Sequence, residues 1–276
     1  MGPGQSIAEL TQFATRLADL ARAETAPRFR ANGAVTNKVG AKDDRSDFDP
    51  VTEADRQAER VMRDAIEARY PEHGILGEEF GYTNQGASER WVLDPVDGTR
   101  AFVCGAATWT TLIAFEQAGA PAISVIDQPY TNERWVSSEG ATRFLRGADE
   151  HACAVSEVKR LSEARLSTTD PRASAYFNDA EAAAFAEIAD RARLVRFSFD
   201  AYGYGLLALG QLDLIIEAGL AHYDYAALEP IVTGAGGVVT DWSGGAFSAE
   251  AGGQIIAAAT PELHAEAMRH LTPARR

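Results

Sequence analysis

Residues 91–102 read WVLDPVDGTRAF and place two carboxylates at the end of an apolar run. The run covers residues 91–93, Asp94 follows it directly, and Asp97 comes three positions later. We expect the run to be a buried strand, so that Asp94 begins inside the protein. Two buried carboxylates at this spacing repel each other, and each raises the pKa of the other unless a cation lies between them. The stretch therefore predicts a cation site at the end of a buried strand.

The residues around the two aspartates suit a magnesium ion next to a phosphate group. Oxygen ligands are the ones that Mg²⁺ prefers, and the carbonyl of Val96 can add a neutral oxygen to the carboxylates. Pro95 makes the turn rigid. Gly98 and Thr99 open a short helix whose free N–H groups can bind phosphate, and the Thr99 hydroxyl can orient a water molecule. A single acidic residue at the end of an element is more often a helix cap or a solvated turn, so that reading stays open for each carboxylate alone.

Further carboxylates lie at the ends of other predicted elements, where loops usually carry function. They are Asp49, Glu78, Glu79 and Asp224. No nucleophile motif accompanies them, because the sequence contains neither G-x-S-x-G nor a Walker A stretch. Carboxylates and a phosphate cradle without a nucleophile indicate attack of a metal-activated water on a phosphate ester.

Apolar periodicity predicts the elements along the rest of the chain. A helix is expected over residues 5–23, and a second one follows Thr52, which can cap it. Strands are expected at 74–77 and 91–94 and, as an antiparallel meander, at 108–116, 122–127, 133–137 and 142–145. Strands and helices then alternate, which indicates α/β layering, and they include a helix expected directly after Asp224, over 225–235.

Four segments together resemble the signatures of the inositol monophosphatase family, whose members are Mg²⁺-dependent phosphomonoesterases. They follow the family's order and are DPVTEAD at 49–55, GEE at 77–79, WVLDPVDGTRAF at 91–102 and AHYDYAALEPIVTGAGG at 221–237. The resemblance implies an α/β protein, a layered αβαβα sandwich made of an α+β lobe and an α/β lobe. Because the composition changes near residues 140–160, we place the lobes at 1–150, with most metal ligands, and 151–276, with Asp224 and the substrate-selecting residues.

The resemblance also implies metal ligands, and it implies them residue by residue. Glu78 and Asp94, with the carbonyl of Val96, would hold a first ion. Asp94, Asp97 and Asp224 would hold a second. Glu78 could also serve a third and weaker site, so that two or three Mg²⁺ ions are expected.

Catalytic and phosphate-binding roles follow from the same resemblance. Thr99, hydrogen-bonded to Asp49, would position the attacking water. Glu79 would contact the metal ligands without binding the metal itself. The backbone amides of Gly98 and Thr99 would contact the phosphate. Lys38 resembles a lysine on the family's mobile loop and is a candidate substrate contact.

The part of the substrate away from the phosphate is expected to face residues 196–225, which contain Asp200 and Glu217. A substrate with an ammonium group needs carboxylates there, because charge-assisted hydrogen bonds offset the cost of desolvating the cation. Asp200 can instead cap a helix, and Glu217 can be a surface residue at a strand end. Arg196 is a further candidate contact, with a surface charge or an ion pair between the lobes as the alternative.

The same segment is similar to the histidinol-phosphate phosphatase branch of the family, which has Asp-x-Tyr at 200–202 and Tyr-Asp-Tyr at 223–225. The similarity predicts hydrolysis of L-histidinol phosphate to L-histidinol and phosphate. Inositol 1-phosphate or a related sugar or nucleotide phosphate is the alternative substrate. A different class is a non-catalytic regulatory protein that contacts RNA or a transcription complex. It is disfavoured because the sequence has a suitable residue at every position that the family uses to bind metal or to orient water.

Composition limits the partners and the compartment. The chain has 276 residues, 46% of them hydrophobic, which is enough for a sizeable core, and a net charge of −14, which opposes nucleic acid binding. No apolar run approaches the roughly 20 residues of a membrane span. Cys104 and Cys153 lie in no Cys-x-x-Cys pair, which indicates a reducing compartment. We expect a cytoplasmic protein that binds a small phosphate monoester and neither nucleic acid nor membrane, and the resemblance implies a homodimer.

Overall fold

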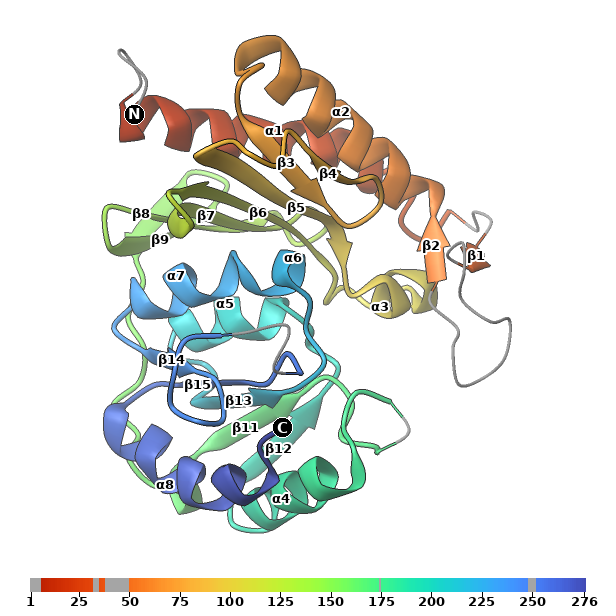
Figure 1. Ribbon diagram of the computed structural model, residues 1–276. Helices are drawn as coiled ribbons and strands as arrows, with labels where there is room; N and C mark the ends of the chain where they lie inside the picture. The colour runs from red at the N-terminus through yellow and green to blue at the C-terminus, as the bar shows by residue number, and fades with distance from the viewer. Residues whose placement is uncertain (1–5, 32–34, 38–49, 174, 248–251) are drawn as a thin grey trace.

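The computed structural model of the chain describes residues 6–31, 35–37, 50–173, 175–247 and 252–276. Helices and sheets alternate in layers, in the order helix, sheet, helix, sheet, helix (Figure 1). The expected αβαβα sandwich is therefore confirmed. Within the described residues, no helix is both long enough and apolar enough to cross a bilayer.

Three helix layers enclose the two sheets (Figure 1). The outer layer next to the first sheet consists of α1 (Ile7–Thr25) and α2 (Glu53–Arg69). The middle layer consists of α5 (Tyr202–Ala208), α6 (His222–Tyr225) and α7 (Leu228–Thr233). The far layer consists of α4 (Asp179–Ala189) and α8 (Pro261–Leu271). The remaining helices are α3 (Thr99–Cys104) and the 3-10 turns η1 (Leu161–Glu163) and η2 (Thr272–Ala274).

The larger sheet has eight strands in the order β10-β9-β8-β7-β6-β5-β3-β4. Only the β3–β5 pair in it is parallel. Its strands are β3 (Gly74–Gly77), β4 (Gly81–Thr83), β5 (Glu89–Asp97), β6 (Thr110–Gln117), β7 (Ala120–Gln128), β8 (Glu133–Ser138), β9 (Ala141–Arg146) and β10 (Asp149–Ala152). The predicted meander is confirmed as β6 to β9, whereas β4 and β10 were not predicted.

The smaller sheet has five strands in the order β12-β11-β13-β15-β14. They are β11 (Arg165–Thr168), β12 (Leu194–Phe197), β13 (Leu214–Glu217), β14 (Val238–Thr240) and β15 (Ile255–Ala258). A separate ribbon pairs β1 (Val35–Asn37) with β2 (Pro50–Thr52). We call the chain up to β10 the N-terminal lobe and the chain after β10 the C-terminal lobe. The division at residue 150 stays a prediction, and β10 spans that position.

Strand β5 is buried on both faces, which explains its nearly continuous apolar sequence. Because side chains alternate along a strand, Trp91 and Leu93 pack under α1 and α2, whereas Val92 packs against the middle helices. Asp94 lies on the same face as Val92 and therefore points toward the middle layer. The strand ends at the edge of the apolar core, beside the cavity between the lobes.

The end of β5 and the helix expected after Asp224 both differ from the prediction. The strand does not stop at Asp94 but continues to Asp97, with a shift in its pairing register between the two aspartates. Pro95 lies in this irregularity, where its missing N–H breaks no ladder bond. The helix expected over 225–235 is split into α6 and α7, so that Asp224 lies inside α6. Pro230 accounts for the split, because its ring clashes with the carbonyl four residues earlier in a continuous helix.

The close approach of α5 to the larger sheet generates the first prediction. A Cβ atom at Gly205 would lie 2.7 Å from the buried indole of Trp135 on β8. Gly205→Ala should lower the free energy of unfolding by roughly 1–3 kcal/mol through overpacking, even though alanine favours the helix. Urea unfolding followed by circular dichroism measures the effect. Gly86→Ala is the control, since its Cβ meets no atom within 4 Å, and equal midpoints for both variants would contradict the packing argument.

Candidate active site

A cavity of about 350 Å³ lies between the two lobes. The N-terminal lobe lines it with the end of β5 and the beginning of α3. The C-terminal lobe lines it with the segments that follow β11 and β13 and with α6. Nine of the predicted residues reach it, namely Glu78, Asp94, Val96, Asp97, Gly98, Thr99, Asp200, Glu217 and Asp224.

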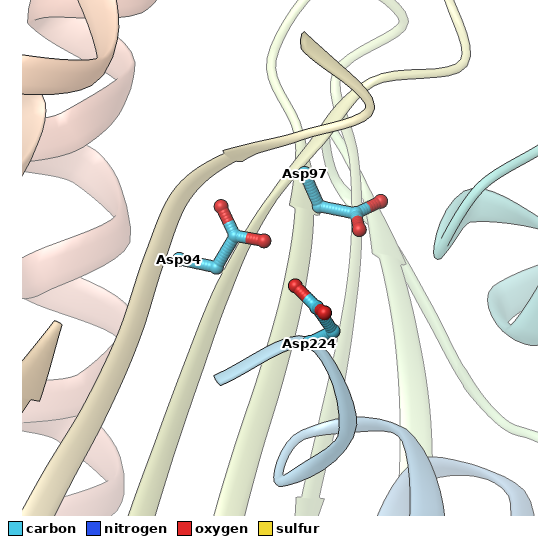
Figure 2. A group of neighbouring side chains, drawn as sticks. All are labelled: Asp94, Asp97 and Asp224. Carbon is cyan, nitrogen blue, oxygen red and sulfur yellow. The ribbon is translucent and has the colours of Figure 1, made fainter. Parts of the chain in front are cut away.

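Three carboxylates form the centre of this cavity. One oxygen from each of Asp94, Asp97 and Asp224 lies within 4.8 Å of the others. Figure 2 shows Asp94 and Asp97 on the same strand and Asp224 reaching toward them from the other lobe. Asp94 is buried and the other two are half-buried, and such a set of hard oxygen donors fits a divalent cation such as Mg²⁺.

Backbone N–H groups orient each of the three carboxylates. Asp94 accepts the N–H of Val96 at 3.1 Å, Asp97 accepts the N–H of Ala201 at 2.7 Å, and Asp224 accepts the N–H of Ala221 at 2.7 Å. The bond from Ala201 to Asp97 crosses from one lobe to the other. These backbone hydrogen bonds therefore orient the three carboxylates without help from a bound ion.

The carboxylates oppose one another electrostatically. Burial, and then the neighbouring Glu78, raises the pKa of Asp94 well above its ordinary value. Burial, and then Asp200, does the same to the pKa of Asp97. A cation among them removes this repulsion and favours the ionised forms.

Glu78 reaches the cavity from the turn after β3, and a buried carboxylate behind it holds that turn. The side chain of Glu59, on α2, accepts the N–H of Glu79 at 2.7 Å and pairs with Arg63 at 2.7 Å. A Cβ at Gly77 would lie 2.0 Å from Glu59, so only glycine fits between them. Glu79 does not line the cavity.

The N-terminus of α3, which the sequence predicts to bind phosphate, lines the cavity. Gly98 precedes the helix in the left-handed conformation, with φ of 77°, and the chain then presents the first N–H groups of α3 to the cavity. The Thr99 hydroxyl donates to the carbonyl of Val96 at 3.1 Å and lies 3.4 Å from Asp55. Burial raises the pKa of Asp55 to about 6. Asp49, the predicted partner of Thr99, lies outside the described residues, as does Lys38.

Two further carboxylates, which we call the carboxylate wall, line the cavity from the C-terminal lobe. Glu217, at the end of β13, accepts the N–H of Thr169 at 3.1 Å and the hydroxyl of Tyr204 at 2.8 Å. Asp200 adopts the left-handed conformation, with φ of 50°, and lies against the phosphate cradle, since a Cβ at Gly98 would be 3.0 Å from it. Burial, and then Glu217, raises the pKa of Asp200 to about 7. Asp200 does not cap α5, whose first turn receives no side-chain hydrogen bond.

Arg196 does not reach the cavity. It is exposed on β12, an edge strand of the smaller sheet, and it does not line the space that holds Asp200. The chain turns through two left-handed residues, Ser198 and Asp200, so that proximity in sequence does not bring position 196 to the site.

Some lining residues were not anticipated. The guanidinium of Arg100 lies 5.1 Å from the ring centroid of Tyr176, and burial raises the pKa of that phenol to about 12. Thr169 and Tyr204 hold Glu217. Arg100 belongs to the stretch 91–102, which is a signal that could have identified it, whereas Tyr176 and Thr169 follow no motif.

Comparison with known proteins identifies the family. Residues 6–275 match the sequence profile of the inositol monophosphatase family. The chain belongs to this family. Members of the inositol monophosphatase family are phosphoric monoester hydrolases, and this chain is such an enzyme.

Relatives match this family member over most of its length. The chloroplastic bifunctional phosphatase IMPL2 of Arabidopsis thaliana is 37% identical over 254 residues, which are 87% of this chain and 72% of the relative. The histidinol-phosphatase of Mycobacterium tuberculosis is 34% identical over 261 residues, 94% of this chain and 96% of the relative. A solved inositol monophosphatase from Zymomonas mobilis is 37% identical with a TM-score of 0.82 and covers 97% of this chain and 99% of its own.

The raised carboxyl pKa values predict how Mg²⁺ stabilises the protein at different pH. A carboxyl group whose folded pKa is raised stabilises the metal-free fold below the unfolded value of about 3.9. That stability is lost as the pH rises through the folded pKa values, which are well above the ordinary value for the predicted metal ligands Asp94 and Asp97 and about 7 for the neighbouring Asp200. Mg²⁺ competes with protons, so it should raise Tm more at about pH 8 than at about pH 5. Calorimetric scans with Mg²⁺ and with EDTA test this, and a shift that is the same at both pH values would contradict it.

Proposed function

We propose that this phosphatase hydrolyses L-histidinol phosphate to L-histidinol and phosphate. The single observation that carries the proposal is the pair of carboxylates in the cavity, half-buried Asp200 and buried Glu217, with Asp200 next to the predicted phosphate cradle at Gly98. Inositol 1-phosphate is the alternative substrate, followed by related sugar or nucleotide phosphates.

The carboxylate wall suits a cation better than a polyol. Three groups of the chain already donate to Glu217, namely the N–H and hydroxyl of Thr169 and the hydroxyl of Tyr204. Asp200 and Glu217 repel each other across the cavity, which the raised pKa of Asp200 reflects. An ammonium group between them would relieve this repulsion and form charge-assisted hydrogen bonds with both. A neutral polyol would leave the repulsion in place.

The relatives support both candidates. The histidinol-phosphatase of Mycobacterium tuberculosis, similar over nearly the whole of both chains, favours histidinol phosphate. The Zymomonas mobilis inositol monophosphatase supports the alternative. The charge of the wall is the reason for preferring the first.

The proposed reaction assigns each group a task. Glu78, Asp94, Asp97 and Asp224 would hold Mg²⁺, two or three ions, with the carbonyl of Val96 as a further ligand. Bound Mg²⁺ lowers the pKa of a water molecule and neutralises charge on the phosphate oxygens.

The chain's own polar groups orient the reactants. The N–H groups at the start of α3, after Gly98, bind the phosphate, and the Thr99 hydroxyl, with Asp49, orients the attacking water. The water oxygen bonds to phosphorus as the ester P–O bond breaks; one proton of the water passes to the leaving oxygen, which becomes the hydroxyl of histidinol, and the other stays with the phosphate. Asp200 and Glu217 hold the amine of the substrate in place. The homodimer and the cytoplasmic location stay predictions from the sequence.

A substrate panel tests the proposal directly. Phosphate release with Mg²⁺ should show a kcat/KM at least about tenfold higher for histidinol phosphate than for inositol 1-phosphate, fructose 1,6-bisphosphate or adenosine bisphosphate, a difference of about 1.4 kcal/mol. Asp94→Asn is the inactive control and should keep its fold, because the substitution removes a repelling charge. A tenfold preference for inositol 1-phosphate would replace histidinol phosphate with the alternative.

A variant separates recognition of the amine from the hydrolytic step. Asp200→Asn keeps the size of the side chain but removes the charge facing the ammonium group. The free energy of transition-state binding for histidinol phosphate, calculated from the ratio of kcat/KM values, should weaken by roughly 1–3 kcal/mol. The rate with inositol 1-phosphate should change much less, and it serves as the internal control. Equal losses with both substrates would mean that Asp200 orders the loop and does not recognise a cation.

A further inference from the structure

Glu116 is a buried carboxylate that the proposed reaction does not use. It lies on β6, is 1% exposed and does not line the cavity. One of its oxygens accepts the Nε–H of Arg90 at 2.7 Å, and the other lies 2.6 Å from Nε2 of His222. We call Glu116, Arg90 and His222 the Glu116 network.

The N-terminal lobe holds one side of this network rigidly. Arg90 on β5 is the direct cross-strand partner of Glu116 on β6. A third strand contributes Tyr82, whose hydroxyl lies 3.3 Å from the Arg90 guanidinium. Side chains alternate along a strand, so Arg90 lies on the same face of β5 as Asp94, the buried carboxylate of the proposed metal site.

The C-terminal lobe supplies the other side through α6. His222 is the first residue of this four-residue helix, and Asp224 lies two positions later. A proton on Nε2 of His222 would be donated to Glu116, because Arg90, which is 3.2 Å from the same nitrogen, is itself a donor. Helix α6 also packs against β5, and within its own lobe Tyr225 stacks on Phe247 with ring centroids 3.8 Å apart. The His222 bond thus ties the helix that carries Asp224 to the sheet that carries Asp94.

We propose that the Glu116 network positions Asp224 relative to Asp94 and Asp97 and so sets the affinity for the divalent cation. The inference rests on the proposed metal-binding role of these three carboxylates. Like charges on opposite lobes repel, and a charge-assisted hydrogen bond across the lobe boundary opposes their separation. The network acts through Asp224 and touches neither the cation nor the substrate.

Substitutions at His222 distinguish the effect of its hydrogen bond from the effect of its side-chain volume. His222→Leu removes the bond to Glu116, whereas the amide of His222→Gln can restore it. Mg²⁺ titration by calorimetry, without substrate, should show about tenfold weaker binding for the leucine variant and nearly normal binding for the glutamine variant. At saturating Mg²⁺, kcat of the leucine variant should be within about threefold of wild type, because the metal ligands are intact.

A second histidine gives a matched control. His270 on α8 lies 3.1 Å from Glu187, but both are in the C-terminal lobe, away from the cavity. His270→Leu should leave Mg²⁺ affinity unchanged. Circular dichroism checks folding, and His222→Phe, which also lacks the bond to Glu116 but keeps the ring volume, replaces His222→Leu in the same comparison should that variant unfold.

Each outcome bears on a different claim. Wild-type protein that shows neither a saturable heat change nor a rise in Tm with Mg²⁺ removes the proposed metal site and, with it, the basis of the inference. If wild type binds and His222→Leu binds equally well, the network does not position Asp224. Equal weakening in His222→Leu and His222→Gln, or in His270→Leu, also overturns the inference, because the loss then has no link to the bond with Glu116.

Discussion

Repulsion between buried carboxylates governs the architecture of this phosphatase. Asp94, Asp97 and Asp224 bring like charges within reach of one cation, and burial opposes the ionisation of the first two. Such an arrangement persists only where the elements that carry it are stabilised by other contacts. An apolar core that includes Val92 from one lobe and Leu228 from the other supplies those contacts.

Buried acidic side chains outside the cavity give this site its rigidity. Glu59 pairs with Arg63 and holds the turn that presents Glu78. Glu116 pairs with Arg90 and reaches across the lobe boundary. In each pair an arginine neutralises the carboxylate, so the charge that orders the site adds no repulsion inside it.

The cavity combines the start of a helix with carboxylates from the other lobe. The start of α3, the predicted phosphate cradle, lines it. Asp200 lies against Gly98, and Glu217 lines the same cavity. In the proposed reaction, a small molecule with a phosphate and an ammonium group would bind to both sets of groups.

The sequence by itself determined the layers, most of the elements along the chain and most of the carboxylates that meet in the cavity. Apolar periodicity reflects which face of each element is buried, and the stretch 91–102 carries its ligands within one continuous strand and turn. The tertiary structure decided the parts that depend on separate segments meeting. It divided the helix around Pro230, placed Arg196 outside the cavity and brought Tyr176 into it. Packing between lobes sets these positions, and no local pattern encodes contacts between residues so far apart in the chain.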